Sequence, residues 1–121
     1  MFYRNIAIYK SIIFIGASKS DNFSEGHHQL ATLFKALSHP ARIAIVEYLL
    51  IVNTCICSDI VNELPMAQPT VSQHLSALKN AEIIKVNIEG TAICYRLNME
   101  TLQKIEDYFF AITKKLEGKY C

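Results

Sequence analysis

Apolar residues recur along the chain first with a helical period, then with a strand period, and then with a helical period again. One stripe of a first helix is formed by Leu30, Leu33, Phe34 and Leu37. Their spacing predicts a helix that ends near residue 38. Pro40 suits the first turn of a second helix that reaches about Leu50. This second helix is apolar nearly all round, so we expect it to be buried.

Residues 58–80 predict two short helices joined by a tight turn. Ser58 or Asp59 can cap the first of them, which reaches Leu64, and Pro65 then forces the chain to turn. The second helix begins at residue 68 or 69 and runs to about Asn80. Two helices in this arrangement form a helix-turn-helix.

After residue 83 the apolar positions alternate, which predicts a β-hairpin. We place a two-residue turn at Glu89-Gly90, which pairs Val86 with Ile93. Cys94 then lies on the more polar side of the hairpin. The polar residues expected beside Cys94 are Asn87 and Arg96.

Asn98 can cap a final helix. The apolar stripe of this helix consists of Leu102, Ile105, Phe109, Ile112 and Leu116. The predicted fold is mainly α with one small β-hairpin, in the order α-α-α-α-β-β-α, which is a winged helix-turn-helix.

Composition fits one globular domain of modest core size. The chain has 121 residues, of which 51% are hydrophobic and 19% charged, and its formal net charge is +1. A nucleic-acid partner would therefore need a local binding surface. A polar break at residues 18–26 separates an N-terminal arm, residues 1–24, from a winged helix-turn-helix domain, residues 25–121. The apolar run in the arm is too short to span a membrane.

The helix from residue 68 to residue 80 is the candidate DNA-reading element. Val71, Leu75 and Leu78 share its inner face, which leaves short, uncharged side chains outside. Gln73 is suited to an adenine edge, and Ala67 provides no capping side chain, so the first N–H groups can meet a phosphate. His74 can either contact DNA in the major groove or pack against the protein at the flank of the helix. The predicted DNA-binding residues are Gln68, Pro69, Thr70, Ser72, Gln73, His74, Ser76, Lys85 and Thr91.

A solvated polar face on an ordinary helix is the alternative interpretation of these residues. The order of the predicted elements, rather than the polar face alone, favours DNA binding. The chain shows no pairing of a nucleophile with a base and no phosphate-binding loop, so we do not expect an enzyme.

Four cysteines stand at positions 55, 57, 94 and 121. Cys55 and Cys57 are too close in sequence to bridge each other without strain, so we expect reduced thiols and a cytoplasmic protein. In an extended segment these two thiols share one face. Cys55 and Cys57 are therefore candidate metal ligands, and Cys94 is the preferred third ligand. Thiolate ligands select soft metal ions. The alternative is that the cysteines are small buried apolar residues.

Three stretches of the sequence carry a resemblance to a known family. They are "LFKALSHPARIAIVEYLL", "DIVNELPMAQPTVSQHLSALKNAEIIK" and "GTAICYRLN", which together cover roughly residues 30 to 98. In order and spacing they resemble the ArsR/SmtB family of bacterial repressors. The resemblance implies a homodimer that binds operator DNA and releases it when an inducer binds. It also implies a dimer interface on the first and last helices, at Leu30, Leu33, Phe34, Leu102, Ile105, Phe109 and Ile112.

The Cys-x-Cys pair resembles that of the family's arsenical and cadmium/lead sensors. Ile60 stands where arsenical sensors often have a third cysteine, and His39 stands in place of the family's common Asp. The final helix, at residues 99–117, has no histidine, which argues against the family's zinc site. We expect As(III) or Sb(III) as inducer, with Cd(II) or Pb(II) as alternatives. A thiol-redox or persulfide sensor, a ligand-independent repressor and a protein-interaction module remain as rivals.

Overall fold

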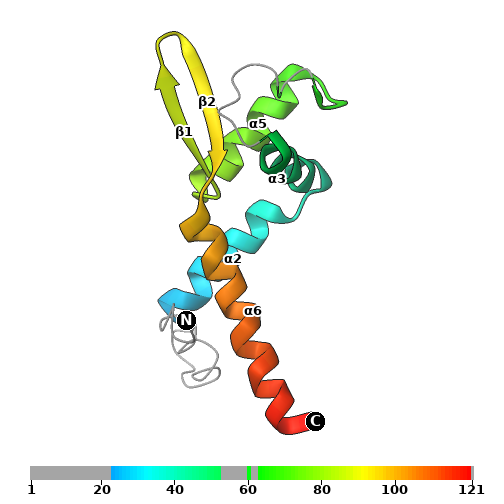
Figure 1. The fold of residues 1–121 in the computed structure, drawn as a ribbon, viewed down its shortest axis with the longest axis vertical. Coiled ribbons are helices and arrows are strands. Elements are labelled where there is room, and N and C mark those ends of the chain that lie inside the picture. The colour runs from blue at the N-terminus through cyan, green and yellow to red at the C-terminus, as the bar shows by residue number, and fades with distance from the viewer. Residues whose placement is uncertain (1–22, 53–59, 61–62, 121) are drawn as a thin grey trace. The chain divides into compact units, whose positions relative to one another are not determined.

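The computed structural model describes residues 23–52, 60 and 63–120. Within them the chain forms the elements shown in Figure 1. The helices are α2 (Glu25–Leu37), α3 (Pro40–Val52), α5 (Gln68–Asn80) and α6 (Met99–Tyr120), and the strands are β1 (Ile84–Glu89) and β2 (Ala92–Leu97). This order agrees with the predicted one. The predicted helix from residue 58 or 59 to Leu64 lies mostly outside the described residues, although Ile60 and Glu63 are helical.

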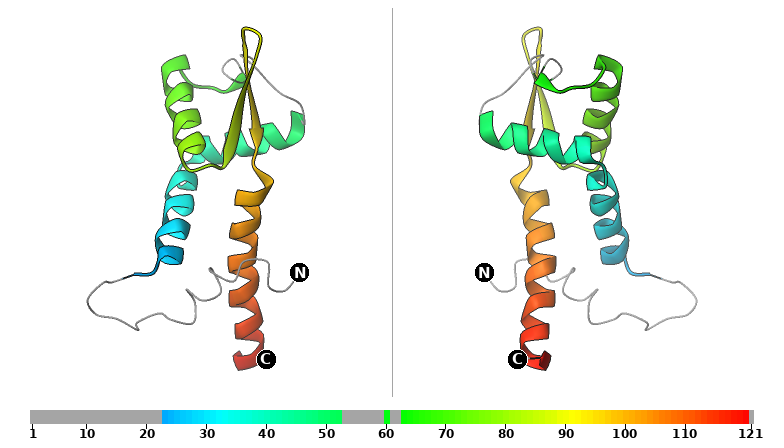
Figure 2. Two further views of the ribbon diagram at one scale, coloured as in Figure 1. Left: turned by 90° about the vertical axis from the view of Figure 1, so that its left-hand side faces the viewer. Right: turned by 90° about the vertical axis from the view of Figure 1, so that its right-hand side faces the viewer.

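The chain divides into two compact units. Phe34–Met99 forms one unit, which holds α3, α5 and the hairpin. The described residues 23–33 and 100–120 belong to the other. In the first unit β1 runs beside α5, and α3 contacts both α5 and β2, as both views in Figure 2 show. The hairpin therefore stands next to the predicted DNA-reading helix.

The core of the Phe34–Met99 unit is built from side chains of every element in it. Its fully buried members are Ile45, Ile60, Val71, Leu78, Ile83 and Ile84. The predicted inner face of α5 is confirmed, because Val71, Leu75 and Leu78 are all buried. The expectation that α3 is buried all round is wrong: Leu50 and Ile51 at its end are 68% and 78% exposed.

Local sequence explains where α2 and α3 begin. The hydroxyl of Ser24 accepts a hydrogen bond from the His27 N–H, and the His27 imidazole accepts one from the Ser24 N–H. This reciprocal pair is a capping box with histidine in place of the usual Glu or Gln. At the start of α3, His39 Nδ1 accepts a hydrogen bond from the Ala41 N–H at 3.0 Å, and Pro40 occupies the first helical position.

The chain leaves α5 through a helix-ending motif that leads directly into the hairpin. The Ile83 N–H donates to the Leu78 carbonyl and the Glu82 N–H donates to the Lys79 carbonyl, both at 2.9 Å. These two bonds define a Schellman motif, in which the residue that follows the helix C-cap adopts a left-handed conformation. That residue is Glu82, with φ of 62°. The Asn98 side-chain amide donates to the Glu82 carbonyl and thereby fixes the position of the loop.

The turn of the hairpin lies one residue later in the chain than predicted. Val86 pairs with Tyr95, and Glu89 pairs with Ala92, so the turn is Gly90-Thr91 and the predicted pairing of Val86 with Ile93 is wrong. The reason is the position of the glycine. Gly90 has φ of +65° and occupies the first place of the turn, as a type II′ turn requires. Because both strands shift together, the predicted sides survive, and Cys94 shares a face with Asn87 and Arg96.

None of the helices in the described part of the chain is both long enough and apolar enough to cross a membrane.

Candidate nucleic-acid interface

The outer face of α5 is exposed and uncharged apart from Lys79 near its end. Its side chains on that face are Gln68, Pro69, Thr70, Ser72, Gln73 and Ser76, all of them exposed. The three buried residues on the opposite side hold the helix to the core, so the outer face is presented at a fixed rotation. Short polar side chains on a rigidly held helix are suited to the edges of bases in a major groove.

The start of α5 offers fewer backbone donors than the sequence indicated. Ala67 precedes the helix without a side-chain cap, as expected. However, the Thr70 and Val71 N–H groups both donate to the Ala67 carbonyl, and Pro69 has no N–H. The first turn therefore offers the N–H of Gln68 alone to a phosphate.

His74 does not share the exposed face of α5. Its side chain is only 8% exposed, and its Nδ1 accepts a hydrogen bond from Arg42 Nε at 3.1 Å. The sequence left its role open between the groove and the helix flank, and the structure places it at the flank against α3. Burial lowers the pKa of His74 below its usual value of 6.5, and the nearby His39 and Arg42 lower it further.

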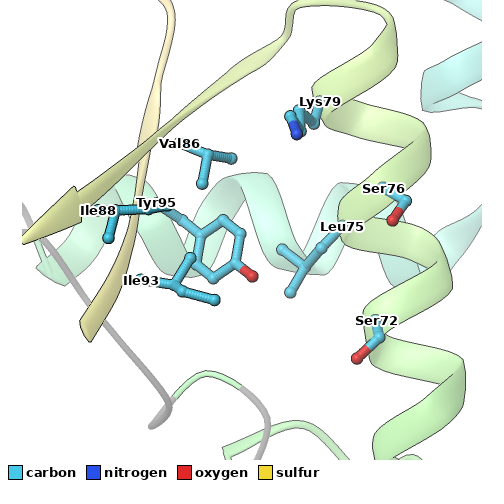
Figure 3. Close-up of a pocket in the computed structure, with 8 residues that line it drawn as sticks. All are labelled: Ser72, Leu75, Ser76, Lys79, Val86, Ile88, Ile93 and Tyr95. Carbon is cyan, nitrogen blue, oxygen red and sulfur yellow. The ribbon is translucent and has the colours of Figure 1, made fainter. Parts of the chain in front are cut away.

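An open groove of about 280 Å³ separates α5 from the hairpin. From α5 it is lined by Ser72, Leu75, Ser76 and Lys79, and from the hairpin by Val86, Ile88, Ile93 and Tyr95. Figure 3 shows the Tyr95 ring pointing from β2 toward Leu75 across the groove. One wall thus carries hydroxyl groups and an amine, and the other wall is mainly apolar.

Several residues of this groove were missed by the sequence interpretation, which selected only Lys85 and Thr91 from the hairpin. Both of these are exposed, but Lys85 lies on the strand face that points away from the groove. Ile88 and Ile93 are directly opposite each other across the strands, and they are 75% and 46% exposed. Strand alternation puts both residues on the same hairpin face as Tyr95, but it does not show that this face borders α5.

Cys94 is the one predicted thiol ligand within the described residues. It is 3% exposed, and its Sγ donates a hydrogen bond to a carboxylate oxygen of Glu89 at 3.6 Å. As the donor in this bond, the sulfur carries a proton that a soft ion would have to displace. Cys55, Cys57 and Cys121 lie outside the described residues. No three metal-binding side chains of residues 23–52, 60 and 63–120 come together.

The predicted dimer-interface residues differ in exposure. Leu30 and Leu33 are buried, whereas Phe34, Leu102, Ile105 and Ile112 are half-buried. On α6, Phe109 is 51% exposed and Leu116 is 44% exposed. Two large apolar side chains seven residues apart on one helix fall on the same face. This face of α6 is a candidate surface for association.

The fold and the exposed polar face of α5 beside a β-hairpin define a winged helix-turn-helix DNA-binding regulator. The family model for bacterial regulatory proteins of the arsR family matches residues 39–86. The arsenical resistance operon repressor of Staphylococcus xylosus is 30% identical over 95 residues, which are 78% of this chain and 90% of that protein. The chain therefore belongs to the arsR family of bacterial regulatory proteins. It is a transcriptional regulator and not an enzyme.

Two further similarities are to a second regulator and to a solved DNA-binding domain. A cadmium resistance transcriptional regulatory protein, a CadC homolog of Staphylococcus aureus, is 31% identical over 79% of each chain. The solution structure of the homodimeric winged helix-turn-helix DNA-binding domain of a possible ArsR-family regulator from Mycobacterium bovis superposes with a TM-score of 0.60. That similarity covers 85% of this chain and 91% of that domain at 24% identity, and it confirms the predicted fold class.

Proposed function

We propose that this regulator is a dimeric, cytoplasmic repressor that binds operator DNA through α5 and the hairpin. We further propose that a soft ion bound to its cysteine thiolates releases it from the DNA. Trivalent arsenic or antimony is the preferred inducer. The observation that carries the DNA-binding part is the exposed face of α5, which is uncharged apart from Lys79 and is held beside the hairpin by a buried inner face.

The groove between α5 and the hairpin suggests how DNA is seated. If α5 enters a major groove and the hairpin tip reaches the neighbouring minor groove, one sugar-phosphate strand passes between them. Lys79 and the hydroxyl groups of Ser72 and Ser76 line the wall that would meet phosphate oxygens. The apolar Ile88 and Ile93 would meet the sugars or the minor-groove edge. The remaining predicted contacts are Gln68, Pro69, Thr70, Gln73 and Thr91, with Lys85 on the outer side of the hairpin.

The low net charge and the exposed apolar surface of α6 both support a dimer. A net charge of +1 gives one chain little general attraction for DNA, and two copies double every phosphate contact. Two-fold symmetry also matches paired half-sites one helical turn apart. The exposed Phe109 and Leu116 supply apolar area for such an interface, and the M. bovis domain of similar fold is homodimeric.

The inducer hypothesis is supported by the donor atoms and by the relatives. Cys55, Cys57 and Cys94 supply three sulfur donors, a set that suits soft ions and not magnesium or calcium. Release requires that the ion and the DNA oppose each other, and a 100-fold loss of DNA affinity corresponds to about 2.7 kcal/mol of coupling. An arsenical resistance repressor and a cadmium resistance regulator are both about 30% identical to the chain. The second relative supports Cd(II) as the alternative inducer, and Pb(II) is a further alternative that rests on the family resemblance alone.

The DNA-binding proposal is tested by fluorescence anisotropy on a labelled fragment from upstream of the protein's own gene. Gln73→Ala should weaken specific binding by about 1–3 kcal/mol if Gln73 reads a base. Gln29→Ala is the matched control, because Gln29 is exposed on α2 and far in sequence from α5. Equal affinity of Gln73→Ala and Gln29→Ala for the DNA would show that Gln73 does not read a base. No binding of the wild type to any such fragment would contradict the repressor function.

A further inference from the structure

Two histidines and an arginine form a contact between the start of α3 and the middle of α5. Arg42 Nε donates to His74 Nδ1 at 3.1 Å, and Arg42 Nη1 donates to the Ala36 carbonyl at 3.2 Å. The rings of His39 and His74 are 4.4 Å apart between centroids, tilted by 47°. All four residues belong to the Phe34–Met99 unit. One guanidinium group thus links the end of α2 to the flank of α5.

These hydrogen bonds determine the protonation state of His74. Arg42 has only donors, so His74 Nδ1 must present a lone pair, and the ring must be neutral with its proton on Nε2. Protonation of Nδ1 would place two N–H donors face to face and two positive charges in contact. The Arg42–His74 bond can therefore form only while His74 is neutral.

We infer that His74 is a positioning residue that fastens α5 to the start of α3, and that its protonation weakens DNA binding by loosening this fastening. The inference rests on the proposed DNA-binding role of α5. His74 follows Gln73 directly on the helix, so a change in its attachment to α3 alters the rotation of the residue proposed to read a base. DNA binding and proton binding at His74 then oppose each other through linkage.

The described groups that act on His74 oppose a positive charge on its ring. From α3 it faces Arg42 and His39, and both lower its pKa together with burial. On β1, which also packs against α5, the charged residues Lys85 and Glu89 lie on the strand face that points away from the groove. Among the described residues, no carboxylate is found among the groups that act on His74, and both charged neighbours there disfavour a proton on its ring.

The test compares DNA affinity at about pH 7.5 and about pH 5.5, a range in which histidine titrates. His74→Asn keeps an acceptor close to the position of Nδ1 but cannot take up a proton at these pH values. His28→Asn is the matched control, since His28 is exposed on α2. We expect the wild type and His28→Asn to lose affinity about two- to tenfold at the lower pH, since the pKa of His74 lies below 6.5, and His74→Asn to keep its affinity.

Equal pH responses of the wild type and His74→Asn would overturn the inference. If His74→Asn fails to fold, the titration of the wild-type His74 ring by NMR replaces it. Linkage requires DNA to lower the pKa of His74, and an unchanged pKa on DNA binding would overturn the inference as well. The two proposals fail differently. A chain that binds no DNA at either pH refutes the repressor function, whereas one that binds DNA without a response from His74 refutes only the fastening.

Discussion

Replacing Glu82 by glycine should stabilise the protein at the junction between α5 and the hairpin. Glu82 is the one non-glycine residue with a positive φ among the described residues. It occupies the position at which helices that end in this motif usually have glycine. The hydrogen bonds of the motif involve backbone atoms, so Glu82→Gly leaves them in place.

The size of the effect follows from two opposing terms. A residue with a Cβ in the left-handed region costs about 1–2 kcal/mol. Glycine recovers this cost but loses about 0.5–1 kcal/mol through the greater freedom of the unfolded chain. We therefore expect a net gain of about 0.5–1 kcal/mol in the free energy of unfolding. For a chain of this length the gain raises the Tm by about 2–6 °C.

Two control variants separate backbone strain from other causes. Glu82→Gln removes the negative charge near the end of α5 and keeps the strain, so it measures the charge effect alone. Gly90→Ala introduces strain at the other positive φ, where a Cβ would meet nothing within 4 Å. It should therefore lower the free energy of unfolding by about 0.5–1 kcal/mol without a steric clash.

Urea unfolding at one fixed protein concentration measures all three variants against the wild type, since dimer stability depends on concentration. Equal stability of Glu82→Gly and Glu82→Gln would show that Glu82 is not strained in this loop. A neutral Gly90→Ala would likewise contradict the type II′ turn.

Other predictions concern the core, the association surface and pH. Ile45→Ala should lower the free energy of unfolding by about 2–5 kcal/mol, because Ile45 is completely buried, and urea unfolding will show whether the site is packed. Phe109→Ala should weaken dimerisation about tenfold or more in sedimentation experiments if the exposed face of α6 is the interface, and an unchanged dimer would exclude that face. Because the pKa of folded His74 lies below its unfolded value of 6.5, the unfolded state binds more protons in this window. The contribution of His74 to the free energy of unfolding is therefore complete above pH 6.5 and is lost as pH falls below that value. His74→Asn should remove this pH dependence, which thermal unfolding at several pH values will test.

Within the described residues, the sequence alone predicted the helices and the strands, because their periods differ clearly. The inner face of α5 was predicted correctly because three apolar residues at helical spacing have only one way to face a core. The hairpin register was wrong because glycine suits either place of a two-residue turn, and only the backbone angles show which place it takes.

The groove and the contact of His74 could not be predicted from sequence pattern. Arg42 and His74 are 32 residues apart, and nothing in their spacing indicates that α3 brings a guanidinium group to the flank of α5. Likewise, the apolar wall at Ile88 and Ile93 depends on how the hairpin stands beside the helix. The thiol set remains a prediction, because Cys55 and Cys57 lie outside the described residues.

The central claim is that thiolate ligands couple an ion to the release of DNA. The most direct measurement is a release titration of the DNA-bound protein with arsenite, with cadmium and peroxide in parallel, on the wild type, on the Cys55→Ser/Cys57→Ser double variant and on Cys121→Ser as control. We predict that arsenite releases the wild type and Cys121→Ser, whereas the double variant stays bound. Release of the double variant by arsenite, or release of the wild type by peroxide but not by arsenite, would contradict the account.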